Sequence, residues 1–222
     1  MSTIREFNLT VPLDADQTAE LQPGDAVYLN GLIFTGREKV YTQIFDRNIK
    51  PEIDIADTCN VNFHCSPAVT ETAPGEYRIP SVTATASFRF AKYMERTIRN
   101  LGVRAVIGKA GMSPEIYQQA FRPYGAIYLT TVGYGLGAIY GRGITRVKDV
   151  FWKEELGLAQ AMWILEVKKF GPFLVDYAGG DHCLFELENK KINPILSECY
   201  KGLEPPILKR LGETDNPQQE ML

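Results

Sequence analysis

Four polar residues that could do chemistry gather in one segment, residues 81–111. Thr85, Ser87 and Arg89 lie between a predicted strand and an amphipathic helix, and Lys109 follows a short apolar run. The dipole of a helix disfavours a cation in its first turn. An anion bound at the helix N-terminus beside Arg89 would remove this penalty. These residues therefore predict a pocket for a small carboxylate or phosphate, and the alternative is a capped helix whose Arg and Lys are simply solvated.

Two further residues have suitable chemistry at the ends of other predicted strands. Arg37 begins a helix predicted over residues 37–46, so it is a second arginine at a strand-to-helix junction. His64 ends a strand predicted over residues 60–64. A histidine there could act as an acid or base, because it titrates near neutral pH. It could equally hold a loop by hydrogen bonds, and the sequence leaves both interpretations open.

The elements that must position these residues are strands and helices in alternation. The central helix has apolar residues at helical spacing, with Ser87 as its expected N-cap and Gly102 as its expected stop. Asn30-Gly31 and Gly179-Gly180 predict the turns of two hairpins. The pattern as a whole predicts a mixed α/β domain. The hairpins are expected within 26–35 and 172–187, further strands over 4–11, 126–131, 145–151 and 162–167, and further helices over 113–121 and within 189–203.

A glycine-rich segment, residues 133–138, offers a competing interpretation. Its G-x-G-x-x-A pattern after a predicted strand is a permitted variant of the dinucleotide-binding fingerprint. However, Gly141-Arg142-Gly143 leaves little room for the helix that should follow, and no acidic strand end comes after it. The alternative is a turn of small residues that lets the backbone approach a neighbour closely.

The composition excludes several classes of function. The chain has 222 residues and a net charge of −3, which favours neither nucleic acid nor an anionic membrane as a partner. No apolar run approaches the roughly 18 residues of a membrane span, and the N-terminus lacks a secretory signal. We therefore expect a soluble, cytoplasmic protein.

The four cysteines predict no metal site in this chain. They stand at positions 59, 65, 183 and 199, and none forms a Cys-x-x-Cys pair. Their spacing matches no ligand pattern for zinc or for an iron–sulfur cluster. Isolated reduced thiols are the expected state.

Several segments, taken in order, resemble one known family. The chain is similar to the β subunits of L-tartrate dehydratase and to the C-terminal half of class I (iron–sulfur) fumarases, from about residue 24 to residue 187. No single matching segment is specific to the family, but the order and spacing of the segments together are. They are residues 25–38, 62–67, 85–90, 106–112, 149–157 and 167–175. We accordingly predict a lead-in over 1–24, the family domain over 25–203 and a mobile tail over 204–222.

The resemblance implies a fold, a cofactor and partners. The fold is a swivelling β/β/α domain. A separate α subunit or N-terminal domain holds a [4Fe–4S] cluster, and this chain would hold none. The implied activity is that of a hydro-lyase acting on a small dicarboxylic hydroxy acid, in an α2β2 assembly.

The resemblance also implies roles for individual residues. Thr85 falls on the catalytic base and Lys109 on the family's lysine, so we predict both as catalytic residues, while Arg37 and Arg89 fall on arginines that hold carboxylates. A threonine hydroxyl is a poor base, so flanking cations and exclusion of water would have to lower its pKa. Ser87 and His64 complete the predicted substrate-binding set.

The chain also departs from the family pattern around these residues. The family's G-P-T-T-S-x-R-M becomes residues 83–90 here, without the Gly-Pro and without the second threonine. The residue after Arg37 is Glu rather than Asp, Tyr41 replaces a histidine, and Cys65-Ser66 replaces an alanine-glycine pair. Because the presumed active groups themselves remain, the first hypothesis is a hydro-lyase with an altered substrate. The second is a non-catalytic dicarboxylate-binding or regulatory paralogue.

Overall fold

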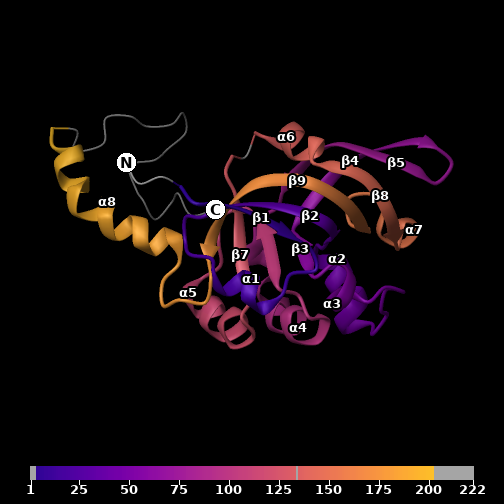
Figure 1. Ribbon diagram of the computed structural model, residues 1–222, viewed down its shortest axis with the longest axis horizontal. Helices are drawn as coiled ribbons and strands as arrows, with labels where there is room; N and C mark the ends of the chain where they lie inside the picture. The colour runs from indigo at the N-terminus through magenta and orange to yellow at the C-terminus, as the bar shows by residue number, and fades with distance from the viewer. Residues whose placement is uncertain (1–3, 134, 203–222) are drawn as a thin grey trace, which may run out of the picture. The chain divides into compact units, whose positions relative to one another are not determined.

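The computed structural model describes residues 4–133 and 135–202 (Figure 1). The chain divides into two compact units, residues 1–185 and residues 186–222. The tail predicted over residues 204–222 lies outside the described residues. The predicted domain boundaries after residues 24 and 203 stay predictions.

The first unit contains a mixed sheet of seven strands (Figure 1). Neighbours among β1, β2, β3, β6 and β7 run parallel, whereas β9 runs antiparallel to β7, β8 and β2. Because β9 pairs with both β7 and β2, it closes the strands between them into a small barrel-like ring. The mixed α/β prediction is therefore confirmed. In spatial order the strands are β1 (Glu6–Thr10), β2 (Ala26–Thr35), β3 (Val61–Phe63), β6 (Ala105–Gly108), β7 (Ile127–Thr131), β9 (Met162–Tyr177) and β8 (Ile144–Phe151).

The hairpin predicted at Asn30-Gly31 is wrong, because β2 runs straight through this pair. Strand β9 pairs with residues on both sides of it, and the register shifts at Gly31. Gly31 has φ 110°, and a Cβ there would lie 2.6 Å from the Val11 carbonyl oxygen. The Asn30 side chain accepts from the Lys169 amide at 2.9 Å. The pair thus makes an irregularity within a long strand, where a glycine is needed for its backbone conformation.

Helices cover one face of the sheet (Figure 1). The longest of them, α4 (Ala91–Leu101), buries Tyr93, Met94 and Ile98, and it ends at Gly102 with φ 68° as predicted. The helix predicted from Arg37 is also confirmed. The remaining elements of this layer are α1 (Ala15–Ala19), α2 (Glu38–Tyr41) with the π-helical turn η1 (Thr42–Asp46), α3 (Ile55–Thr58), α5 (Pro114–Ile116) with η3 (Tyr117–Phe121), and the 3-10 turn η4 (Arg122–Tyr124).

A β-hairpin and a short helix pack on the sheet's other side (Figure 1). They are β4 (Cys65–Ala73), β5 (Glu76–Ala84) and α6 (Gly137–Arg142). A Cβ at Gly137 would lie 2.5 Å from Ser81 Oγ, and one at Gly141 would overlap the Pro80 carbonyl. The glycines therefore let α6 approach β5 closely, which confirms the small-residue alternative for this segment. Helix α7 (Lys153–Leu156) follows β8.

Residues of the parallel strands alternate between two apolar clusters. In β6, Ile107 belongs to the cluster shared with β5 and α6, and Val106 to the cluster shared with α4. In β7, Leu129 and Tyr128 divide in the same way. Both faces of these strands are consequently buried, as is usual for parallel strands.

The hairpin predicted around Gly179-Gly180 is also wrong. Strand β9 ends at Tyr177, and helix α8 (Leu184–Tyr200) begins a few residues later. The segment predicted as the returning strand, residues 182–187, contains Leu184, Glu186 and Leu187, which favour helix over strand. An ion pair between Lys191 Nζ and Glu188 Oε1 at 2.6 Å, three residues apart, also supports the helix.

Candidate active site at the carboxyl edge of the sheet

The predicted site residues lie where parallel strands end. Arg37 follows β2, His64 follows β3 and Lys109 follows β6. Because β2, β3 and β6 are adjacent and parallel, their carboxyl ends share one edge of the sheet. The Gly36 amide donates to the Phe63 carbonyl at 3.1 Å, which ties the Arg37 segment to the end of β3.

Thr85 is held between two of these strand ends. Its amide donates to the His64 carbonyl at 2.6 Å, and its carbonyl accepts from the Lys109 amide at 3.1 Å. Ala86 and Lys109 also form a parallel β-bridge. Thr85 is 9% exposed, and its hydroxyl has no hydrogen-bond partner among the described residues. The backbone of Thr85 is therefore fixed, while its hydroxyl remains available to a ligand.

Three cations accompany this threonine. Arg37 is half-buried and donates from Nη1 to the Ala159 carbonyl at 3.1 Å, while its buried Nε has no hydrogen-bond partner among the residues that the structure describes. Arg89 is exposed, with its guanidinium carbon 5.6 Å from the centre of the Phe90 ring. Lys109 is half-buried. A buried donor without a partner is costly, so the Arg37 Nε is a natural position for a ligand oxygen.

His64 is fully buried, and protein groups occupy both of its ring nitrogens. Nε2 lies 2.6 Å from Tyr41 Oη, and Nδ1 lies 2.7 Å from Ser87 Oγ. Burial disfavours the charged imidazolium and lowers the pKa of His64 to about 3. The ring is therefore neutral, and this geometry is that of a histidine that holds a loop.

Ser87 is not the N-cap of α4, as predicted, but the first residue of the 3-10 turn η2 (Ser87–Phe90). Its hydroxyl bonds inward to His64 and accepts from Tyr128 Oη at 2.7 Å, so it is unavailable to cap the helix. A Cβ at Gly108 would overlap the Ser87 hydroxyl. The serine thus faces the core rather than the solvent.

Sequence reasoning missed the residues that surround this serine and histidine. Tyr41, Asn62 and Tyr128 are all fully buried, and each contributes a polar atom to the cluster. Tyrosines in strands and helices are usually core residues, so no local pattern distinguished Tyr128, whereas Tyr41 was noted only as the replacement of a histidine in the family pattern. Asn62 lies within a strand of otherwise apolar residues, which is the one available signal.

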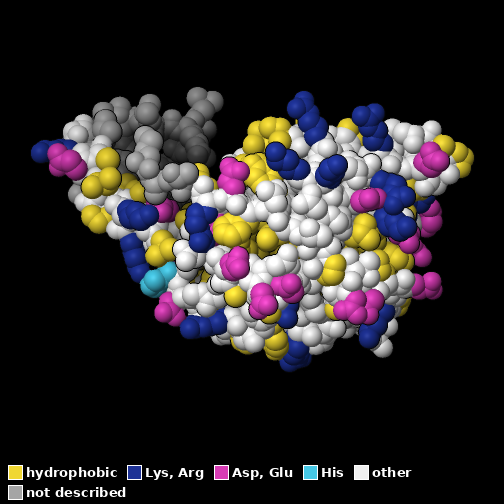
Figure 2. All heavy atoms as spheres, viewed as in Figure 1, with side chains coloured by type: hydrophobic (Ala, Val, Ile, Leu, Met, Phe, Trp, Pro, Cys, Tyr) yellow, Lys and Arg dark blue, Asp and Glu magenta, His cyan; other side chains and the backbone are white. Residues whose placement is uncertain are grey.

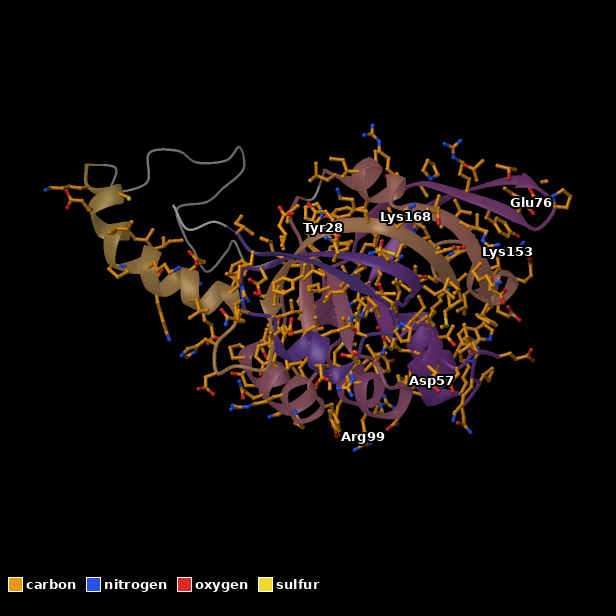
Figure 3. All side chains as sticks on the ribbon, viewed as in Figure 1. Tyr28, Asp57, Glu76, Arg99, Lys153 and Lys168 are labelled. Carbon is orange, nitrogen blue, oxygen red and sulfur yellow. The ribbon has the colours of Figure 1, made fainter. Side chains whose placement is uncertain are left out.

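The charged surface and a cavity elsewhere in the fold do not indicate a different site. Basic and acidic side chains are interspersed on the visible face (Figure 2). A cavity of about 580 Å³ lies at the amino ends of β3 and β6, and it includes none of the six predicted site residues. Asp57 and Arg99, which line it, are labelled in Figure 3. The Asn60 side chain in this cavity already makes two hydrogen bonds to the Leu13 backbone. It accepts from the Leu13 amide and donates to the Leu13 carbonyl, each at 2.8 Å.

The cysteines do not fit an iron–sulfur cluster. Among the described residues, no group of three His, Cys, Asp or Glu side chains could hold a metal. Burial raises the pKa of Cys59 to about 12, and it raises the pKa of Cys65 as well. No described helix is long and apolar enough to cross a membrane.

The chain is thus a mixed α/β domain. Its candidate site combines the Thr85 hydroxyl with three cationic residues from segments at one edge of the sheet. The family described as "Fumarase C-terminus" matches residues 1–185, and the chain belongs to this family. The resemblance inferred from the sequence is thereby confirmed.

Three relatives illustrate the family. The chain is 32% identical over 182 residues to a Methanocaldococcus jannaschii protein provisionally named L(+)-tartrate dehydratase subunit beta, covering 81% of this chain and 91% of that one. It is 27% identical over 195 residues to the L(+)-tartrate dehydratase subunit beta of Escherichia coli (strain K12), covering 86% of this chain and 94% of that one. It is 28% identical over 191 residues to a Geobacillus stearothermophilus protein provisionally named fumarate hydratase class I, covering 86% of this chain but 36% of that protein.

Proposed function

We propose that the chain is the β subunit of an iron–sulfur hydro-lyase of the fumarate hydratase or tartrate dehydratase type. The enzyme would reversibly add or remove water at a small dicarboxylic hydroxy acid. The observation that carries this proposal is the position of Thr85, bonded through its backbone to the His64 and Lys109 segments at one sheet edge. Membership of the fumarase C-terminus family and the names of the relatives support it.

The three cations suit a substrate with two carboxylates. Arg37 offers its buried Nε, and Arg89 and Lys109 add positive charge from neighbouring segments of the same edge. A hydrogen bond between a charged donor and a carboxylate contributes about 1.5–3 kcal/mol. Two or three such contacts would hold the substrate and orient its reacting carbon.

Thr85 would remove the proton from the carbon next to the one that loses hydroxide. Its hydroxyl has no other hydrogen-bond partner among the described residues, so it is free to approach that proton. The nearby cations would favour its deprotonated form, most effectively once water is excluded. Exclusion of water requires a second body over this edge, and we assign that role to a cluster-bearing α subunit.

The cofactor in this proposal is a [4Fe–4S] cluster held by the α subunit and not by this chain. When bound there, the cluster would supply a Lewis acid for the departing hydroxide. We further propose an α2β2 assembly in the cytoplasm.

Anaerobic affinity purification with the full chain as bait tests the proposal. We expect a brown partner with iron–sulfur absorbance, and dehydratase activity toward malate, tartrate or a related acid. A chain that purifies alone and shows no activity with any supplied α subunit would refute it. If such a chain still bound dicarboxylates, the non-catalytic paralogue would be the correct interpretation.

A further inference from the structure

Five buried polar side chains form one continuous hydrogen-bonded chain behind the candidate site. Asn62 Nδ2 donates to Tyr41 Oη at 3.1 Å, and Tyr41 Oη lies 2.6 Å from His64 Nε2. His64 Nδ1 lies 2.7 Å from Ser87 Oγ, which accepts from Tyr128 Oη at 2.7 Å. All five residues are fully buried. We refer to these five residues as the polar clamp.

The polar clamp joins four elements that are distant in the sequence. Tyr41 comes from α2, Asn62 from β3, Ser87 from η2 and Tyr128 from β7, and His64 directly follows β3. A neutral imidazole has one donor and one acceptor, so it can join two hydroxyls at once. The low pKa of His64 keeps the ring in this neutral form.

The polar clamp acts on the backbone on either side of Ala86. His64 holds Thr85 through its backbone carbonyl, at 2.6 Å from the Thr85 amide, and it holds Ser87 through its ring. The Lys109 amide holds Thr85 from the other strand end at 3.1 Å. Residues 85–87 are thus fixed at several points, and Arg89 continues the same turn.

The burial of these groups argues for a positional role. Apolar groups of the same shape would give nearly the same stability, because the net contribution of a buried hydrogen bond is small. A fully paired polar network adds directional constraints that apolar packing lacks. A fixed threonine hydroxyl at the site is what such constraints would secure.

We propose that Tyr41 and Tyr128 are positioning residues that act through His64 and Ser87 to hold the Thr85 hydroxyl toward the substrate. This inference rests on the proposed function for its catalytic consequence. Neither tyrosine reaches the substrate, because both are fully buried.

The catalytic test uses the purified complex of the full chain with its partner. Tyr128→Phe and Tyr41→Phe should each lower kcat about tenfold or more, with KM changed less than threefold. The double variant Ser87→Ala/Tyr128→Phe should be no slower than Ser87→Ala, because Tyr128 acts through Ser87. The matched control is Tyr177→Phe, which removes a buried hydroxyl that has no hydrogen-bond partner in the described part of the chain. Additive losses in the double variant, or an unchanged kcat in Tyr128→Phe, would overturn the proposal.

A second measurement does not depend on activity. Amide hydrogen exchange of the full chain, followed by NMR, reports on the hydrogen bond from the Thr85 amide to His64. Exchange at Thr85 should be at least tenfold faster in Tyr41→Phe and Tyr128→Phe than in the wild type or in Tyr177→Phe. Unchanged exchange at Thr85 in both variants would overturn the inference. If the complex has no hydro-lyase activity, the proposed function fails, while this exchange result still decides whether the polar clamp holds Thr85.

Discussion

The burial of His64 predicts a specific dependence of stability on pH. The pKa of this histidine is about 3 in the folded chain, against about 6.5 when unfolded. Above pH 6.5 both states hold the ring neutral, so the full stability is present. As the pH falls below 6.5, the His64 ring binds a proton in the unfolded state but not in the folded state. The free energy of unfolding therefore decreases between pH 6.5 and pH 3.

The size of this effect follows from the separation of the two pKa values. Between pH 7.5 and pH 5.0, the unfolded histidine becomes almost fully protonated while the folded one stays neutral. The linkage relation then gives a loss of about 2 kcal/mol from His64 alone. No reduction for solvent screening applies, because the ring is fully buried.

Urea unfolding at pH 7.5 and pH 5.0 measures this effect. Tryptophan fluorescence is a suitable signal, because Trp163 is fully buried in the unit that contains His64. His64→Gln should lose about 2 kcal/mol less than the wild type between the two pH values. His182→Gln is the matched control, because His182 is the chain's second histidine and is exposed. Equal losses in wild type and His64→Gln would refute a buried, neutral His64.

Three further predictions concern the site. Thr85→Val should lower kcat with little change in KM, whereas Thr83→Val, at an exposed position, should leave both unchanged in steady-state assays of the complex. Arg89→Ala should lower kcat/KM by roughly tenfold to a hundredfold, mainly through KM, since a charged contact to the substrate is lost; an unchanged KM would remove Arg89 from the site. Gly108→Ala should destabilise the chain by about 1–3 kcal/mol in urea unfolding, because the new methyl overlaps the Ser87 hydroxyl. Gly135→Ala, where a Cβ meets nothing within 4 Å, is its control.

Local signals predicted those elements whose structure depends on neighbouring residues. Helix α4 and its end at Gly102 follow from apolar spacing and a left-handed glycine. The placement of Arg37 and Lys109 at strand ends follows equally from short apolar runs. These features need only contacts within a few residues, so the sequence contains them directly.

The hairpin predicted at Asn30-Gly31 failed for a non-local reason, whereas the one predicted at Gly179-Gly180 failed because the residues after it favour a helix. At Asn30-Gly31 the turn signal was strong, but β9 pairs along both halves of β2 and keeps the chain extended. After β9, Gly179-Gly180 leads into α8 rather than into a returning strand. Pairing with a strand more than a hundred residues away outweighed a local preference, and no window of sequence reveals such a partner.

The same distinction applies to the candidate site. Residue types and family motifs predicted roles in the site for Thr85, Lys109 and the two arginines, and they left a loop-holding role open for His64. Only the tertiary structure showed that Tyr41 and Tyr128 converge on His64 and Ser87. Hydrogen-bond direction and burial arise where α2, β3, η2 and β7 meet, and no one of these segments specifies the others. Candidate reactive groups can therefore be predicted from the sequence, whereas the groups that hold them in place depend on the packing of distant elements.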